Sequence, residues 1–126
     1  MKKLKGIEGK LDIAWSKLVK LKAGMKCEIE NCHKKVLNSH HIYSRSKRST
    51  RWDTMNGICL CVGHHTFSSK FSAHKTPLEF IRWLDKYKGQ EYMDLLMLKA
   101  NQTSHLHPFE KEILLQELNK EIKELS

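Results

Sequence analysis

The sequence predicts a small α+β domain, and three observations support that fold class. A length of 126 residues is typical of one domain with one hydrophobic core. Helical periodicity marks both ends of the chain, whereas the middle contains two short β-favouring segments. All four cysteines and six of the eight histidines fall within residues 27–74, which indicates a metal-stabilised centre. We expect a single domain over residues 1–126, with a core at about 27–84 and a helical extension at about 90–126.

Four helices are expected, one before and three after the middle segment. Residues 10–23 carry apolar side chains near helical spacing and stop before Gly24. Thr76, Pro77 and Glu79 form a capping-box pattern, so a helix should cover residues 77–87 and end near Gly89. Further helices are expected at 91–100 and 108–125. The last has an apolar stripe that favours packing within the chain over a seam between two copies; it consists of Leu115, Leu118, Ile122 and Leu125.

Two strands are expected between these helices, at residues 36–42 and 56–62, and they should pair as a hairpin. Cys59 lies two residues before Cys61, on the same strand face, and is interpreted as core packing, with metal binding as the alternative. We assign Trp15, Trp52 and Trp83 to the core rather than to base stacking.

The composition favours a soluble protein of a reducing compartment. Hydrophobic residues make up 40% of the chain, and its longest apolar run, residues 58–62, is far shorter than the ~18 residues of a membrane helix. Glu8, Lys10 and Asp12 interrupt any secretory apolar region after the basic start, so we expect a cytoplasmic location. In that compartment cysteines serve as metal ligands more often than as disulfides.

The positive charge is concentrated in the first part of the chain. Residues 1–51 carry 14 Lys and Arg against 4 acidic residues, whereas residues 52–126 carry 9 against 10, which together give the net charge of +9. A basic half suits a polyanion, because each cation near a phosphate releases condensed counterions. Anionic membranes and acidic proteins attract the same charge, so nucleic acid is favoured only weakly by composition.

The first chemical motif is a pair of thiols, Cys27-x4-Cys32, at the spacing by which a turn presents two sulfurs to Zn²⁺. Cys61 and His64, in the second strand candidate and just after it, complete a tetrahedral Cys₃His set. Such a closed site contributes folding free energy to a small domain. Cys59 is the alternative fourth ligand to His64.

A second group of imidazoles remains once these four residues are assigned to zinc. His40 and His41 lie near the end of the first strand candidate, and His65 follows His64. Adjacent residues on a strand point to opposite faces, but twist at a strand end can turn both rings toward one site, one ring binding metal and the other activating water. Asn56 should lie where the hairpin returns beside the first strand.

These motifs resemble the HNH endonucleases of the ββα-metal fold. The resemblance covers about residues 11–84 and is strongest over 27–74, where the order Cys-x4-Cys, His40-His41-Ile42, Asn56 and Leu60-Cys61-x2-His64-His65 agrees in type and spacing. The sequences of residues 51–53, 56–57 and 72–77 are similar to those of small phage-encoded members.

The resemblance implies a role for each matching position. His41 corresponds to the general base and Asn56 to the residue that holds the hairpin loop and the base in place. His40 and His65 correspond to ligands of a catalytic divalent ion: Mg²⁺, Mn²⁺, Ni²⁺ or Zn²⁺. Many members have a further His or Asn where this chain has Ser69, and His74 is the natural substitute. Members usually have Cys at the position of His64, but imidazole is an acceptable zinc ligand.

The function that the resemblance implies is metal-dependent hydrolysis of DNA, leaving 5′-phosphate and 3′-hydroxyl ends, in the host cytoplasm if the chain is phage-encoded. Four cations between His41 and Asn56 are expected to contact DNA phosphates, with a solvated loop as the alternative; they are Arg45, Lys47, Arg48 and Arg51.

The alternative function is a zinc-stabilised module that binds nucleic acid without cleaving it. The second imidazole group argues against it, because binding alone does not require His40, His41, Asn56 and His65 together. A partner for the C-terminal helix, either a second copy or a phage protein, is left open.

Overall fold

The computed structural model describes residues 6–126, so Met1, Lys2, Lys3 and Lys5 of the basic half lie outside the described residues. The elements in chain order are α1 (Ile7–Lys22), β1 (Leu37–His41), the 3₁₀ turn η1 (Thr54–Asn56), β2 (Gly57–Cys61), the π-helical turn η2 (Gly63–Phe67), α2 (Pro77–Lys88), α3 (Gln90–Ala100) and α4 (Pro108–Leu125). This mixture of helices and one small sheet confirms the predicted α+β class. The boundaries lie within three residues of those predicted.

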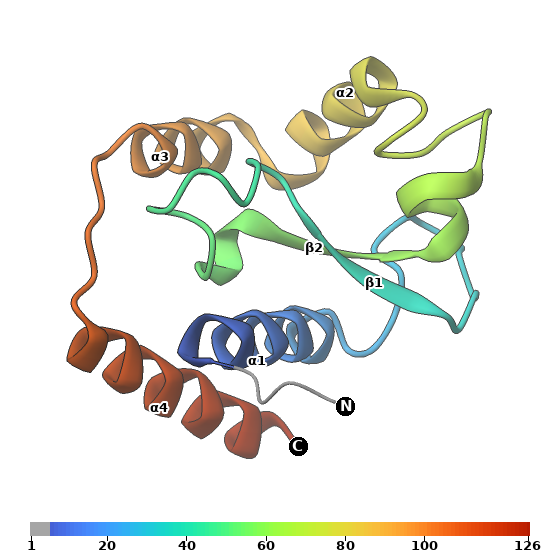
Figure 1. Ribbon diagram of the computed structural model, residues 1–126. Helices are drawn as coiled ribbons and strands as arrows, with labels where there is room; N and C mark the ends of the chain where they lie inside the picture. The colour runs from blue at the N-terminus through green and yellow to red at the C-terminus, as the bar shows by residue number, and fades with distance from the viewer. Residues whose placement is uncertain (1–5) are drawn as a thin grey trace.

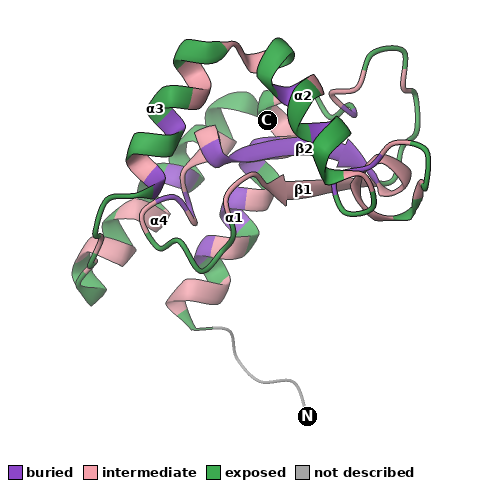
Figure 2. Ribbon diagram, turned by 90° about the horizontal axis from the view of Figure 1, so that it is seen from above, coloured by how far each residue is buried: buried purple, intermediate pink, exposed green. Residues whose placement is uncertain are grey.

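The sheet is a two-stranded antiparallel hairpin, in which Leu37 pairs with Cys61, His40 with Ile58 and His41 with Gly57. Every residue of β2 is buried, whereas every residue of β1 is partly exposed; Figure 2 shows this contrast as a purple strand beside a pink one. β2 is therefore the strand that lies within the core, and β1 is the more exposed strand of the hairpin.

Helices cover the hairpin from two sides, with α1 and α4 on one side and α2 and α3 on the other (Figure 1). One core cluster joins α1 to Trp52, Cys59 and Leu118, and the other joins Ile58 and Leu60 to α2. The buried residues of α1 recur at helical spacing, which explains why this segment folds as a helix against the sheet; they are Leu11, Ala14, Trp15, Leu18 and Val19.

The apolar stripe of α4 packs onto α1 within the same chain. Leu118 is buried, Leu115 and Ile122 pack against the α1 core cluster, and Leu125 at the helix end is half exposed. Leu114 takes part in the same packing, which widens the stripe beyond the four predicted positions. None of the helices within residues 6–126 combines the length and apolar character needed to cross a bilayer.

The predicted capping box at the start of α2 is wrong. Thr76 does occupy the cap position, but its hydroxyl makes no cap hydrogen bond. Instead, Thr76 Oγ1 accepts from Ser72 N at 2.9 Å and donates to Ser72 O at 3.0 Å. The loop before α2 uses this hydroxyl because Ser72 is fully buried there and its backbone groups need partners. A reciprocal bond of the capping type forms at α4, where His107 N donates to Glu110 Oε1 at 3.2 Å.

Candidate metal centres and the cleft between them

The first cluster of ligand atoms comes from three separate segments that meet beside the end of β2. Cys27 and Cys32 lie in the loop after α1, Cys61 ends β2, and His64 lies in η2. Left-handed backbone at Gly24 and Asn31, with φ of 68° and 59°, turns this loop back on itself. Within the cluster the Sγ and imidazole nitrogen atoms all lie within 4.8 Å of one another, so these four residues can hold a metal such as zinc.

The distances within this cluster fit tetrahedral coordination. His64 Nδ1 is 3.2 Å from Cys61 Sγ and 3.5 Å from Cys27 Sγ. A Zn²⁺ ion with its usual bond lengths separates sulfur and nitrogen ligands by about 3.5 Å. Cys59 is not part of the cluster: it is fully buried beside Trp15 in the α1 core. The two thiols therefore belong to different core clusters, although alternation along the strand predicts that they share one face.

The two thiols of the first pair differ in their ionisation. Burial raises the pKa of Cys27 to about 12. Burial also acts to raise the pKa of Cys32, but hydrogen bonds from the Lys34 backbone and the neighbouring thiols outweigh it, so the net pKa is lowered. Because a metal binds thiolates, binding at this cluster must release at least the proton of Cys27.

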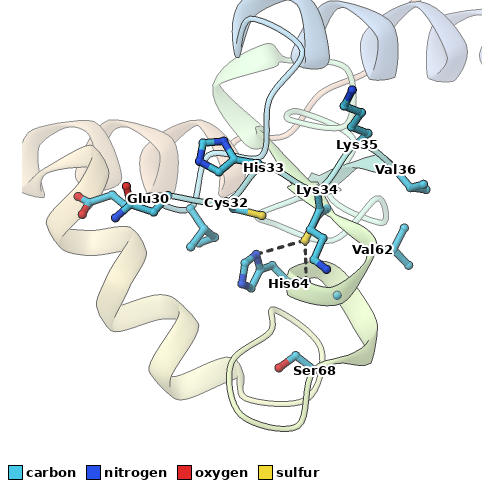
Figure 3. Close-up of a pocket in the computed structure, with 13 residues that line it drawn as sticks. Glu30, Cys32, His33, Lys34, Lys35, Val36, Val62, His64 and Ser68 are labelled. Carbon is cyan, nitrogen blue, oxygen red and sulfur yellow. Dashed lines mark hydrogen bonds between the residues drawn. The ribbon is translucent and has the colours of Figure 1, made fainter.

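A groove of about 700 Å³ runs past this cluster between the Cys32 loop and η2. Figure 3 shows the Cys32 sulfur and the His64 ring turned toward the same centre, with Lys34 beside them and the Lys35 side chain pointing away. Cys27 and Cys61 are nearly fully covered, at 6% and 3% exposure. Two of the three thiols are therefore shielded from solvent, whereas Cys32 is partly exposed in the groove.

The second cluster consists only of imidazoles. His40 comes from β1, His65 from η2 and His74 from the loop before α2, and their ligand nitrogens also lie within 4.8 Å of one another. Neighbouring residues of a helical turn point about 100° apart, which explains how His64 faces the first cluster and His65 the second.

His74 reaches this cluster because its loop folds back along η2. The backbone N–H groups of Ala73 and His74 donate to the carbonyls of His64 and His65, at 2.8 and 3.1 Å. As a result His74 Nε2 lies 3.1 Å from His65 Nε2. Nitrogens that share one metal ion at usual bond lengths are about 3.0–3.4 Å apart, so this pair fits coordination by a common ion. Ser69, the alternative position, is exposed within the same loop.

Two imidazoles of this cluster, His40 and His65, have lowered pKa values and are neutral at physiological pH. Burial lowers the pKa of His40 to about 3, with a further contribution from His65. Burial, followed by the charge of His74, also lowers the pKa of His65. Neutral rings are the form that binds metal. His65 Nδ1 lies 3.2 Å from Asn38 Nδ2. Metal binding through Nε2 would leave the proton on Nδ1, and the Asn38 amide would then have to turn its oxygen toward that proton.

His41 lies on the neighbouring position of β1 and makes different contacts. Its Nε2 is 2.9 Å from the carbonyl oxygen of Arg51. A carbonyl can only accept, so Nε2 carries the proton and Nδ1 keeps the free lone pair. Burial lowers the pKa of His41, although the hydrogen bond to Arg51 acts in the opposite direction. The ring is therefore a neutral base at pH 7.

Asn56 fixes the chain just after this histidine. The side chain is fully buried. Its Oδ1 accepts from Tyr43 N at 2.7 Å, and its Nδ2 donates to Tyr43 O at 3.0 Å. The Asn56 carbonyl also accepts from Ile42 N at 2.9 Å. Asn56 thus connects η1 to the end of β1 and holds the segment that carries His40 and His41.

A single open cleft of about 670 Å³ contains both His41 and the second cluster. Its walls come from β1, η2, the His74 loop and, on the far side, α1, which supplies Asp12, Trp15 and Ser16. A polymeric substrate can enter such a cleft from solvent. The groove beside the first cluster is of similar size, but it does not bring a further histidine such as His41 beside the ligand atoms.

The four predicted phosphate contacts differ in their availability. Arg51 is only 14% exposed and is held by Asp12, whose carboxylate accepts from Arg51 Nε at 3.1 Å and Nη2 at 2.9 Å. Arg48 pairs with Glu8. Arg45 also bonds Asp12 but remains 59% exposed and borders the cleft. No ion pair to Lys47 occurs among the described residues, and its side chain is exposed.

The sequence analysis did not identify Asp12 as a residue of the cleft, and it did not foresee that Trp15 stacks on a histidine there. Both belong to α1, which lies outside the Cys/His-rich segment and carries no motif of its own. Trp15 was assigned to the core and is indeed 2% exposed, yet its ring also stacks on His41. Comparison of the chain with protein-family models, with curated proteins and with solved structures gave no match.

Proposed function

We propose that this protein is a metal-dependent DNA endonuclease of the HNH type, with a ββα-metal core and a zinc knuckle. The observation that carries the proposal is the cleft in which a neutral histidine base, His41, lies beside a three-imidazole metal cluster. Neither a purely structural zinc domain nor a nucleic-acid-binding module needs an open cleft that combines these two features.

His41 acts as the general base in this proposal. Its Nε2–H bond to the Arg51 carbonyl sets the tautomer and leaves Nδ1 to accept the proton of the attacking water. Its lowered pKa keeps the ring unprotonated before the reaction. In-line attack on phosphorus then leaves a 5′-phosphate and a 3′-hydroxyl end. Asn56 maintains the position of the base through its two hydrogen bonds to Tyr43.

His40, His65 and His74 would hold the catalytic divalent ion, and three ligands leave coordination positions for water and phosphate. The ion would polarise a phosphoryl oxygen and stabilise the negative charge that develops on the leaving oxygen. Cys27, Cys32, Cys61 and His64 would hold a structural zinc, because thiolate-rich, covered sites favour that metal.

Arg45 and Lys47 are the best candidates for contact with the DNA backbone. Both are exposed, and Arg45 lies at the cleft itself. Arg51 serves the fold instead, because its guanidinium is already neutralised by Asp12 and is mostly covered. Phosphate contacts of this kind set affinity and salt dependence without reading sequence.

The test is cleavage of supercoiled plasmid by the purified chain, with EDTA or with Mg²⁺, Mn²⁺, Ni²⁺ or Zn²⁺. We expect relaxed or linear product only when a divalent ion is present, and we expect DNA ligase to reseal nicks without prior end repair, as 5′-phosphate and 3′-hydroxyl ends allow. If the parent binds DNA but cuts with none of these ions, the non-cleaving module is the correct function.

A further inference from the structure

The ring of His41 is pressed against α1. The Trp15 and His41 rings stack with centroids 3.8 Å apart and planes within 9°. Trp15 Nε1 also donates to the carbonyl of Asp53 at 2.8 Å, so the indole itself is fixed. Gly57, the strand partner of His41, allows this approach: a Cβ there would lie 2.9 Å from Trp15 Cζ2 and 2.4 Å from Val19 Cγ2. No residue larger than glycine fits between β2 and α1 at this point.

The carbonyl that accepts the His41 hydrogen bond belongs to a segment held by the same helix. Asp12 accepts from the Arg51 guanidinium through both oxygens, and its Oδ1 accepts from Trp52 Nε1 at 2.8 Å. Arg45 adds a further bond to Oδ2 at 3.0 Å. Burial acts to raise the pKa of Asp12, but the hydrogen bonds from Arg51 and Trp52 outweigh it, so the net pKa is lowered and the carboxylate stays charged. A single carboxylate therefore fixes two consecutive residues beside the base.

We infer that Asp12 and Trp15 are positioning residues for His41 and that α1 is a functional part of the cleft; the inference rests on the proposed function for its catalytic consequence. Trp15 sets the plane of the imidazole by stacking. Asp12 sets the direction of the ring within that plane, because it anchors the residue whose carbonyl receives Nε2–H. The two constraints together fix both the orientation and the tautomer of a side chain that otherwise rotates about two bonds.

The contacts that orient His41 come from a helix outside the hairpin, so the hairpin alone does not provide them. Asp12 and Trp15 lie 29 and 26 positions before His41. Asp12 bonds the side chains of Arg51 and Trp52, and Trp15 bonds the carbonyl of Asp53. The motif residues alone, His41 and Asn56, leave the Arg51 carbonyl unsupported. Removal of the anchor should therefore impair the base without removing any catalytic group.

The experiment compares Asp12→Asn with Glu8→Gln in the full chain. Both variants replace a charged carboxylate of α1 by the amide of the same size, and both remove ion pairs with arginines of the 45–51 loop. Only Asp12 accepts hydrogen bonds from both Arg51 and Trp52, the two residues on either side of the peptide bond that contains the anchored carbonyl. We expect Asp12→Asn to lower the single-turnover rate at saturating enzyme and metal by about tenfold, with little change in the enzyme concentration that gives half of the maximal rate. Glu8→Gln should keep the rate within about twofold.

A second measurement reads the ring directly. Long-range ¹H–¹⁵N spectra of the neutral histidine report which ring nitrogen carries the proton. The parent and Glu8→Gln should show His41 protonated at Nε2, whereas Asp12→Asn should show a mixture of both tautomers. Trp15→Phe keeps an aromatic ring but loses the bond to Asp53, and it should change both the rate and the tautomer signal in the same direction.

The outcomes separate the two proposals. An unchanged rate and an unchanged tautomer in Asp12→Asn and Trp15→Phe overturn the positioning role, as does an equal loss of rate in Glu8→Gln. If the parent cleaves no DNA at all, the proposed nuclease function fails, and the tautomer spectra alone then decide whether α1 orients His41.

Discussion

The two ligand clusters of this chain lie on either side of η2 and differ in chemistry and in access. One contains three thiols and an imidazole, of which Cys27 and Cys61 are buried and Cys32 and His64 partly exposed. The other contains imidazoles only and opens into a cleft of about 670 Å³ that also holds His41. Consecutive residues, His64 and His65, supply one ligand to each. The comparison teaches that a single short turn can direct two consecutive histidines into ligand clusters of different donor type.

The largest expected effect concerns the thiol cluster. Cys27→Ser or Cys61→Ser should remove the bound zinc and lower the free energy of unfolding by about 4 kcal/mol or more, because such a site supplies folding free energy to a small domain. The measurements are elemental analysis after dialysis and chemical denaturation.

Cys59→Ser is the matched control, since this thiol is equally buried but lies outside the cluster. It should cost about 1–3 kcal/mol for the buried hydroxyl and leave one zinc per chain. A metal-free chain that keeps its full cooperative transition would show that the cluster does not stabilise the fold.

Substitutions in the imidazole cluster should affect cleavage rather than zinc content. His40→Ala, His65→Ala or His74→Ala should raise the divalent-ion concentration needed for cleavage while the zinc content stays the same. The increase should be at least the roughly 10- to 100-fold that is typical for loss of an outer partner of a ligand, because these residues are proposed as direct ligands. His33→Ala, an exposed histidine of the groove beside the thiol cluster, serves as control and should change neither quantity. Loss of zinc from His65→Ala would contradict the separation of the two centres.

The pH dependence of stability sharpens the same contrast. The pKa of His40 is about 3 in the folded chain, below its ordinary value of 6.5, so between these values the unfolded chain binds more protons. Without a divalent ion, stability should therefore fall as the pH drops below 6.5, by about 1 kcal/mol between pH 7 and 5.5. Denaturation curves at both pH values should show this loss in the parent and a clearly smaller one in His40→Ala. Equal losses in both would mean that His40 is not held neutral by burial.

A smaller effect is expected from the basic loop. Arg45→Gln and Lys47→Gln should each reduce the slope of log affinity against log salt by about 0.9, because each removes one phosphate contact. Arg51→Gln should leave the slope almost unchanged and lower stability instead, since its guanidinium is bound to Asp12. If Arg51 proves to be the residue that sets the slope, the path of the DNA lies deeper in the cleft than proposed.

The sequence predicted the elements well where local pattern decides them. The hairpin and the four helices follow from periodicity and turn residues, and the thiol spacing pointed to the four residues that the fold brings together. The capping box failed because Thr76 has a competing partner in Ser72, which lies four residues earlier and is buried only in the folded chain. A capping-box pattern considers only the first turn of the helix and therefore does not predict this competing partner.

The wall of the cleft was beyond local pattern for a related reason. In the sequence, Asp12 is simply an acidic residue of an amphipathic helix. Its contacts to Arg51 and Trp52 span about forty positions, so no local pattern predicts them. Cys59 and Cys61 belong to different core clusters, a separation that alternation along a strand does not reveal. His74 could be named as a ligand but not placed, because its approach depends on the loop pairing with η2.

The central claim is that the imidazole cleft carries out hydrolysis, with His41 as the base. The most direct measurement is the single-turnover rate of plasmid cleavage by His41→Ala, with zinc and divalent-ion contents matched to the parent. We predict a loss of roughly 10²- to 10⁴-fold in rate with DNA affinity nearly unchanged, because the ring is proposed to bind neither metal nor phosphate. A His41→Ala chain that cuts plasmid as fast as the parent would contradict the account, even if the protein is a nuclease.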